Sequence, residues 1–298
     1  MCHKDWKKEY LELRFPLKRQ DAKKDEYLEL FTKNRPTHLF KFRELNERTL
    51  KLLESNEIWA ARSDTLNDVD EAKFVIDEEA LFHHYKISPA SIVPPGIPLN
   101  EQPPFIRKFI SSIIDDYRKG INICAFSETN CSPAMWAHYA KEHTGICIEY
   151  EVEKIECRHE YIYPVIYGPN PIDLTEVLLA YIRLMTTKIS TRMPIPASKI
   201  PPEWEYNIDY LRWPFFKKYI DWQYENEWRL VKPGNSSDGR KGLIHNMPKP
   251  AIVYLGVNYG KNNEDLKDHL REICKNNNCE IIPMTSDYNN FKILPNPY

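Results

Sequence analysis

The chain has 298 residues, of which 42% are hydrophobic and 12% aromatic, so it can bury a sizeable core and is not a disordered chain. Its formal net charge of −2 excludes a chain-wide nucleic-acid footprint, although it leaves room for a local basic groove. No apolar run approaches the length of a membrane span. The seven cysteines, an odd number without tight zinc-type pairs, predict reduced thiols and a cytoplasmic location.

The first half of the chain predicts a helical extension followed by mixed strands and helices. Charged residues at 4–33, interrupted by Pro16, predict that residues 1–35 form a helical N-terminal extension ahead of a single α+β domain at 36–298. The predicted elements are a strand at 38–43, a helix capped by Asn46, a strand at 57–62, a polar turn at Asn67-Asp68, a helix at about 71–85, a proline-rich loop at 87–104, a helix at about 105–118, a strand at 122–127 and a short helix at 133–140 capped by Ser132.

The second half continues without regular alternation of strands and helices. Its predicted elements are strands at 145–150 and 161–167, a helix at 172–190, a proline-rich break at 192–203, a helix at about 204–219, a strand at 222–230 and a C-terminal strand–helix–strand segment at 250–285. Irregular order of this kind indicates an α+β fold rather than a doubly wound parallel sheet.

The stretch from Trp222 to Leu230 has the strongest period-two pattern. Aromatic and aliphatic side chains alternate with polar ones, which predicts a strand with one face on a core and one face outward. The outward face would carry Glu225 and Glu227 one pleat apart. Two neighbouring carboxylates repel each other unless something positive or reactive lies opposite. Such a pair is consistent with a sugar-directed enzyme and equally with an ordinary charged surface.

Other motifs predict no familiar chemistry. The glycines of Gly234-x-x-x-x-Gly239 have Walker-loop spacing, but Arg240 and Lys241 replace the lysine and hydroxyl residue, so a surface hairpin turn is predicted. Two cysteines and two histidines also lie within a short span, at Cys131, His138, His143 and Cys147. Their spacings fit no zinc pattern, and no metal is expected. Ser127 is not in a nucleophile elbow.

Three predicted strands each carry a pair of polar side chains on one face: Lys41 and Arg43, Ser127 and Thr129, and Glu225 and Glu227. Together a guanidinium to hold pyrophosphate, hydroxyls for a ribose and a carboxylate to stabilise an oxocarbenium ion would suit a dinucleotide whose glycosidic bond must break. Simpler roles stay open, namely an ion pair for the arginine, a strand end for the serine and a solvated face for the acids.

The short helix after Ser127 adds two further candidates. Trp136 and Tyr139 are three residues apart and share a helical face, which core packing explains most simply. His138 and Tyr139 nevertheless follow the Ser127 strand closely, and they are candidates to line the same cleft.

Several segments, taken in order, resemble the bacterial family called domain of unknown function 2971. They are Leu39-Phe-Lys-Phe-Arg43, Glu57-Ile-Trp59 with Leu66-Asn67-Asp68, Phe126-Ser127-Glu128, Met135-Trp136-x-His138-Tyr139-Ala140 with Gly145-Ile-Cys147, and Tyr224-Glu-x-Glu-Trp-Arg229. The resemblance covers about residues 37–231. It departs at Asn67-Asp68-Val69-Asp70, where the family usually has Asn-Asp-Pro-Phe-Asp.

A second resemblance concerns activity. The order Arg43, Ser127-x-Thr129, Glu225-x-Glu227 is similar to the Arg–Ser–Glu signature of ADP-ribosyltransferases. That likeness implies a mixed, split, antiparallel-rich sheet with surrounding helices and NAD as a substrate. Arg43 or Lys41 would bind the NAD, Ser127 would support its nicotinamide ribose, Glu227 would be catalytic, and Glu225 would help to activate or select the acceptor.

The same likeness implies a wider setting. The acceptor would be a protein or a nucleic acid, with water also open, no membrane would be involved, and a bacterial toxin or phage-defence effector with a cognate regulator would be a natural context. The alternative function is a non-catalytic module of a defence or regulatory system, which would use the same groove to sense a nucleotide or to bind a partner protein.

Overall fold

The computed structural model describes residues 5–18, 21, 23–77, 79–80, 108, 111–112, 115–156, 162–179, 208–234, 239–259 and 264–296. The chain divides into two compact units. Unit 1 comprises residues 1–35, 67–119 and 166–219, and unit 2 comprises residues 36–66, 120–165 and 220–298. This differs from the predicted division into an extension and one domain. Residues 67–119 and 166–219, which lie in the sequence between segments of unit 2, group with residues 1–35 in unit 1. Local sequence patterns do not predict such long-range grouping.

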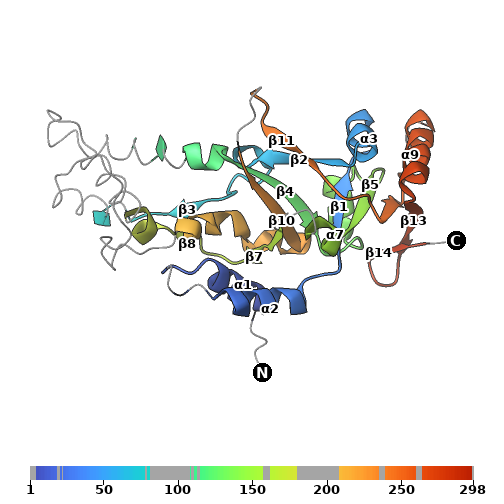
Figure 1. Cartoon of the computed structure of the whole chain (residues 1–298). Coiled ribbons are helices and arrows are strands. Elements are labelled where there is room, and N and C mark those ends of the chain that lie inside the picture. The colour runs from blue at the N-terminus through green and yellow to red at the C-terminus, as the bar shows by residue number, and fades with distance from the viewer. Residues whose placement is uncertain are drawn as a thin grey trace. The chain divides into compact units, whose positions relative to one another are not determined.

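Unit 2 holds the main sheet. Its elements are β1 (His38–Arg43), α3 (Glu47–Glu54), β2 (Glu57–Arg62), the 3-10 helix η2 (Ser63–Thr65), β4 (Ile121–Ser127), α6 (Pro133–Tyr139), β5 (Ile146–Glu151), α7 (Val152–Glu156), β6 (Ile162–Pro164), the 3-10 helix η6 (Ile220–Glu225), β10 (Glu227–Pro233), β11 (Gly242–Asn246), β12 (Ile252–Leu255), α9 (Glu264–Asn277), β13 (Glu280–Asp287) and β14 (Lys292–Pro295). Figure 1 shows these elements along the chain.

The sheet is mixed and mostly antiparallel. Among the described residues ten strands form it, in the order β11, β2, β4, β1, β5, β12, β13 and β14, with β10 paired to β4 and β6 paired to β10. The pair β12 and β13 is parallel, while the other neighbouring strands of this sheet are antiparallel. The α+β class predicted from the sequence is therefore confirmed.

Strand β4 has two partners on one of its edges. Strand β10 pairs with β4 along its whole length, from Ser127 to Ile121. The other edge is therefore shared: β2 pairs near its beginning, at Asn122 and Ile123, and β1 pairs at its end, where Phe40 lies opposite Ser127. Residues 124–126 have no ladder partner on this edge. The sheet consequently divides between β1 and β2, which α3 connects along the chain.

Helices cover both faces of this divided sheet. On one face, α3 begins at the predicted cap, where Asn46 Oδ1 accepts a hydrogen bond from Thr49 N at 2.9 Å. It buries Leu50 and Leu53 and lies beside α9 (Figure 1). On the other face, α6 begins at the predicted Ser132 cap and packs Trp136 edge-on against Phe42, with ring centroids 5.2 Å apart. This second core also contains Cys147 and Tyr254.

Unit 1 is built from α1 (Trp6–Arg14), α2 (Lys24–Asn34), β3 (Phe74–Val75), β7 (Ile166–Tyr167), β8 (Ile172–Asp173), the 3-10 helix η5 (Ile208–Phe216) and β9 (Lys217–Lys218). Its strands form two short parallel pairs, β3 with β8 and β7 with β9. Phe15 joins segments far apart in the chain, because its ring stacks on Phe216 and its carbonyl accepts a hydrogen bond from Trp213 Nε1 at 2.7 Å. No helix among the described residues combines the length and apolar character needed to cross a bilayer.

Most predicted elements of unit 2 are confirmed, whereas several of unit 1 are not. The helix predicted at 71–85 begins instead with turns and the strand β3, which pairs with the distant β8. In the described part of the helix predicted at 204–219, residues 208–218 form a 3-10 helix and β9 rather than an α-helix. The predicted hairpin at 234–241 is wrong, because β10 pairs with β4 and β11 pairs with β2. The proline-rich segments 87–104 and 192–203 lie outside the described residues, as does most of the helix predicted at 172–190.

Gly145 tests how tightly the end of β1 is held. A Cβ at this position would lie 2.3 Å from the carbonyl oxygen of Arg43 and 2.9 Å from that of Ala140. We expect Gly145→Ala to lower the free energy of unfolding by about 1–3 kcal/mol through overpacking, as measured by denaturant titration. Gly168→Ala is the control, since its Cβ would meet only the flexible end of Lys217. Equal losses of stability in the two variants would refute the inference that Gly145 is tightly packed against the end of β1.

Candidate functional site

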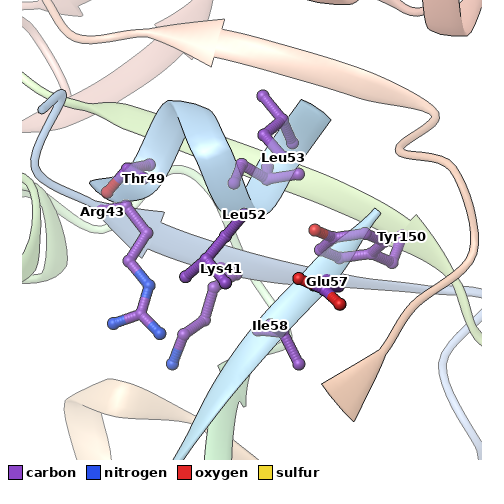
Figure 2. A pocket seen from close by; sticks show the side chains of 9 residues that line it. Lys41, Arg43, Thr49, Leu52, Leu53, Glu57, Ile58 and Tyr150 are labelled. Atoms are coloured by element: carbon purple, nitrogen blue, oxygen red, sulfur yellow. The ribbon is translucent and has the colours of Figure 1, made fainter. Parts of the chain in front are cut away.

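A pocket lies where the sheet divides. It is small, with a cavity volume of about 20 Å³, and it is partly open to solvent. Its lining comes from β1, α3, β2 and β5 and consists of Lys41, Arg43, Thr49, Leu52, Leu53, Glu57, Ile58, Ile148 and Tyr150. Figure 2 shows the Lys41 and Arg43 side chains running side by side with their charged ends pointing the same way. Two cations on the same strand face thus stand together against a largely apolar wall.

Lys41 occupies the gap between β1 and β2. Its Nζ donates a hydrogen bond to the carbonyl oxygen of Ala125, within the stretch of β4 that has no ladder partner on this edge. The ammonium therefore satisfies a backbone acceptor that the divided sheet leaves unpaired. Burial, and after it the neighbouring Arg43, lower the pKa of Lys41 to about 8 against the opposing effects of Cys124 and Glu227.

Arg43 is the last residue of β1 and is half-buried beside Lys41. Burial lowers the pKa of its guanidinium from the usual value, and Arg48 lowers it further. Among the described residues, no acceptor forms a hydrogen bond or an ion pair with this guanidinium. Glu57 also lines the pocket, but it pairs with neither cation there. A guanidinium with this many unmatched donors is suited to an anion from outside the protein.

Glu227 lies away from the pocket lining, in a buried ion pair. Its side chain is 3% exposed, and its Oε1 accepts a hydrogen bond from Arg229 Nε at 2.7 Å. Arg229 Nη2 donates a second bond to Oε2 at 3.1 Å, and the Arg229 side chain is fully buried. This two-point pairing matches the fork of a guanidinium to a carboxylate. The prediction that Glu227 lies on an outward strand face is therefore wrong.

The strand predicted at 222–230 forms only from Glu227 onward. Residues 220–225 are the 3-10 helix η6, and Asn226 takes a left-handed backbone conformation (φ 43°) between helix and strand. Asparagine tolerates this conformation better than most residues. Glu225 is consequently the last residue of η6, whereas Glu227 is the first residue of β10. The two carboxylates are therefore not neighbours on one face of a single strand. It is 4% exposed, and its Oε1 accepts a hydrogen bond from the Tyr139 hydroxyl at 2.5 Å.

The remaining predicted site residues lie around the end of β4 and on α6. Ser127 is fully buried, and its hydroxyl donates to the backbone carbonyl of Glu225 at 2.7 Å. Thr129 follows the strand; its backbone N–H donates to Ser127 Oγ at 3.3 Å and its hydroxyl accepts from Cys131 N at 3.1 Å. His138 is exposed, with its ring 6.4 Å from that of Tyr139.

The strand register decides which predicted residues meet. Phe40, Ser127 and Glu227 lie opposite one another on β1, β4 and β10, so their side chains share one face. Because neighbours along a strand alternate, Lys41 points to the other face, and Arg43 points there with it. The structure thus brings Lys41 and Arg43 together in the pocket and gathers Ser127, Glu225, Glu227 and Tyr139 on the opposite face.

Sequence reasoning missed two parts of this arrangement. Arg229 was visible as a cation two residues after Glu227, a spacing that places both side chains on one strand face. That spacing was the available signal for the ion pair. The contribution of Thr49 and Leu52 to the pocket depends on how α3 lies across the sheet, and no local pattern signals it.

Comparison with known protein families finds a match over part of the chain. Residues 135–230 match the family model described as "Protein of unknown function (DUF2971)". The match supports the resemblance to that family over these residues, which are less than half of the chain; they include Tyr139, Glu225 and Glu227 and exclude Lys41 and Arg43. No curated protein and no solved structure matches the chain.

The Glu227–Arg229 pair leads to a stability prediction. Glu227→Gln keeps the shape of the side chain but removes the negative charge from its buried two-point pair with Arg229. We expect the free energy of unfolding to fall by about 3 kcal/mol in a denaturant titration. Glu44→Gln is the control, because Glu44 pairs with Lys141 at an exposed site, and there the expected change is below about 1 kcal/mol. Similar losses in the two variants would contradict a buried, two-point ion pair.

Proposed function

We propose that this chain binds a nucleotide by its phosphate, through Arg43 and Lys41 in the pocket between β1, α3 and β2. The observation that carries the proposal is the Arg43 guanidinium, which has no acceptor among the described residues and lies beside a second cation. Two adjacent cations repel each other, and each is further disfavoured by burial. A dianionic phosphate between them would relieve both costs and accept several of their N–H donors.

The size of the pocket limits what it can enclose. Pockets that bury most of a drug-sized ligand hold roughly 300–1,000 Å³. This cavity is far smaller, at about 20 Å³, which is the room of roughly one or two water molecules. It can therefore take in only the end of a ligand, and the rest of a nucleotide would lie outside it. Leu52, Ile58 and Ile148 supply apolar walls for a sugar or ring. The two cations thus define the ligand by its phosphate, and adenosine monophosphate is a simple probe that carries one.

Replacing Arg43 tests the binding proposal. We expect adenosine monophosphate to raise the melting temperature of the unaltered protein in a thermal-shift titration, and the shift to weaken as salt increases. Arg43→Met removes the charged donors, so affinity should fall about tenfold or more. Arg48→Met is the matched control, because Arg48 is exposed on α3 and packs over Trp59 rather than lining the pocket. Adenosine should give no comparable shift, and equal losses in the two variants would refute the assignment.

Transfer of ADP-ribose from NAD to a macromolecular acceptor is the second candidate. It is favoured by the adjacency of β1, β4 and β10, the strands that carry Arg43, Ser127 and Glu227. It requires more than adjacency, however, because Glu227 would have to act from inside its ion pair with Arg229. Separating a buried pair costs about 3–5 kcal/mol. Ligand binding therefore has better support than glycosidic-bond cleavage.

Nicotinamide release separates the two candidates. We expect NAD to stabilise the protein against heat without release of free nicotinamide above a protein-free blank, as measured by chromatography. Release that disappears in Arg43→Met and in Glu227→Gln, each checked by circular dichroism to be folded at the assay temperature, would favour the transferase. Checking the fold matters, because loss of the Glu227 charge also weakens the folded state.

A further inference from the structure

We propose that Lys41 is a nucleophilic amine, which forms an imine with a small aldehyde or ketone that carries a phosphate group held by Arg43. This inference rests on the proposed anion site and adds a covalent step to it. It assigns the two cations different tasks: Arg43 binds the anionic end of the ligand, and Lys41 reacts with its carbonyl carbon.

The geometry places the amine within reach of a pocket ligand. Lys41 and Arg43 leave β1 on the same face and both line the pocket. Their charged ends point the same way in Figure 2. Among the described residues no carboxylate forms an ion pair with Lys41, whose Nζ donates to the carbonyl of Ala125. That bond uses one N–H, so a neutral amine keeps its place and retains a lone pair for attack.

The electrostatic setting favours the neutral, reactive form. A lysine becomes nucleophilic when it is desolvated or lies next to another cation, and both conditions hold here. The pKa of Lys41 is lowered to about 8, first by burial and then by Arg43, against the opposing effects of Cys124 and Glu227. Roughly a tenth of such an amine is neutral at pH 7. Glu57 and Tyr150 also face this pocket and are the other titratable groups in its lining.

The reaction is balanced without an oxidant or a reductant. The Lys41 lone pair attacks the carbonyl carbon, and the carbonyl oxygen takes up a proton to give a carbinolamine. Loss of water then forms the C=N bond. The protonated imine carries a positive charge, which the phosphate held at Arg43 would stabilise, so the anion site and the covalent step support each other.

Pyridoxal phosphate is a suitable probe, because it carries both an aldehyde and a phosphate. The full chain is incubated with a limiting amount, reduced with borohydride and mapped by peptide mass spectrometry. We expect the label on Lys41, at a rate that rises with pH through about 8. Pyridoxal, which lacks the phosphate, should label Lys41 at least tenfold more slowly, and Arg43→Met should slow labelling by pyridoxal phosphate similarly.

Two lysine variants complete the test. Lys41→Arg keeps a charge and donors for the Ala125 carbonyl but cannot form an imine, so the label should be lost. Lys51→Arg, on the exposed side of α3, should not change labelling. Labelling spread over exposed lysines and unaffected by Lys41→Arg would overturn the covalent step. If adenosine monophosphate still stabilises the protein in that case, the anion site stands and only the imine fails; if it does not, both fail.

Discussion

The hydrogen bond from Lys41 to the carbonyl of Ala125 is the contact on which the candidate site depends. It exists because two strands share one edge of β4 and leave a gap between their pairings. An unpaired backbone carbonyl in a sheet needs a donor, and a long cationic side chain can reach it from the neighbouring strand. The same gap brings the ammonium next to Arg43 and out of water. The need of the Ala125 carbonyl for a donor therefore explains why Lys41 lies beside Arg43.

The divided sheet also separates charges of opposite sign. The two cations stand on the face covered by α3, while Glu225 and Glu227 are buried on the other face and engaged by Tyr139 and Arg229. Each buried carboxylate thus already has a donor inside the protein. The Arg43 guanidinium, in contrast, has no hydrogen-bond acceptor among the described residues. A ligand that brings negative charge into the pocket completes this arrangement, which is why binding has more support than chemistry at Glu227.

Local features of the fold were predictable from the sequence, whereas their assembly was not. The caps Asn46 and Ser132 act within one helical turn, so residue type and spacing were sufficient. The shared face of Lys41 and Arg43 follows from alternation along one strand. Whether that face also carries Ser127 depends on how β1 and β4 align, and a shift of one residue reverses the answer. Alternation also failed at Asn226, where a single left-handed residue separates Glu225 from the strand.

The chemical difference between Lys41 and Arg43 gives the two positions different capabilities. Either side chain could donate to the Ala125 carbonyl, but a guanidinium stays charged at any physiological pH and offers a fixed fork to a phosphate. An amine is a weaker match to phosphate, and it gives up its proton more readily when burial and a neighbouring cation lower its pKa. The proposed imine step requires this combination, in which a cation that can become a nucleophile lies beside one that cannot.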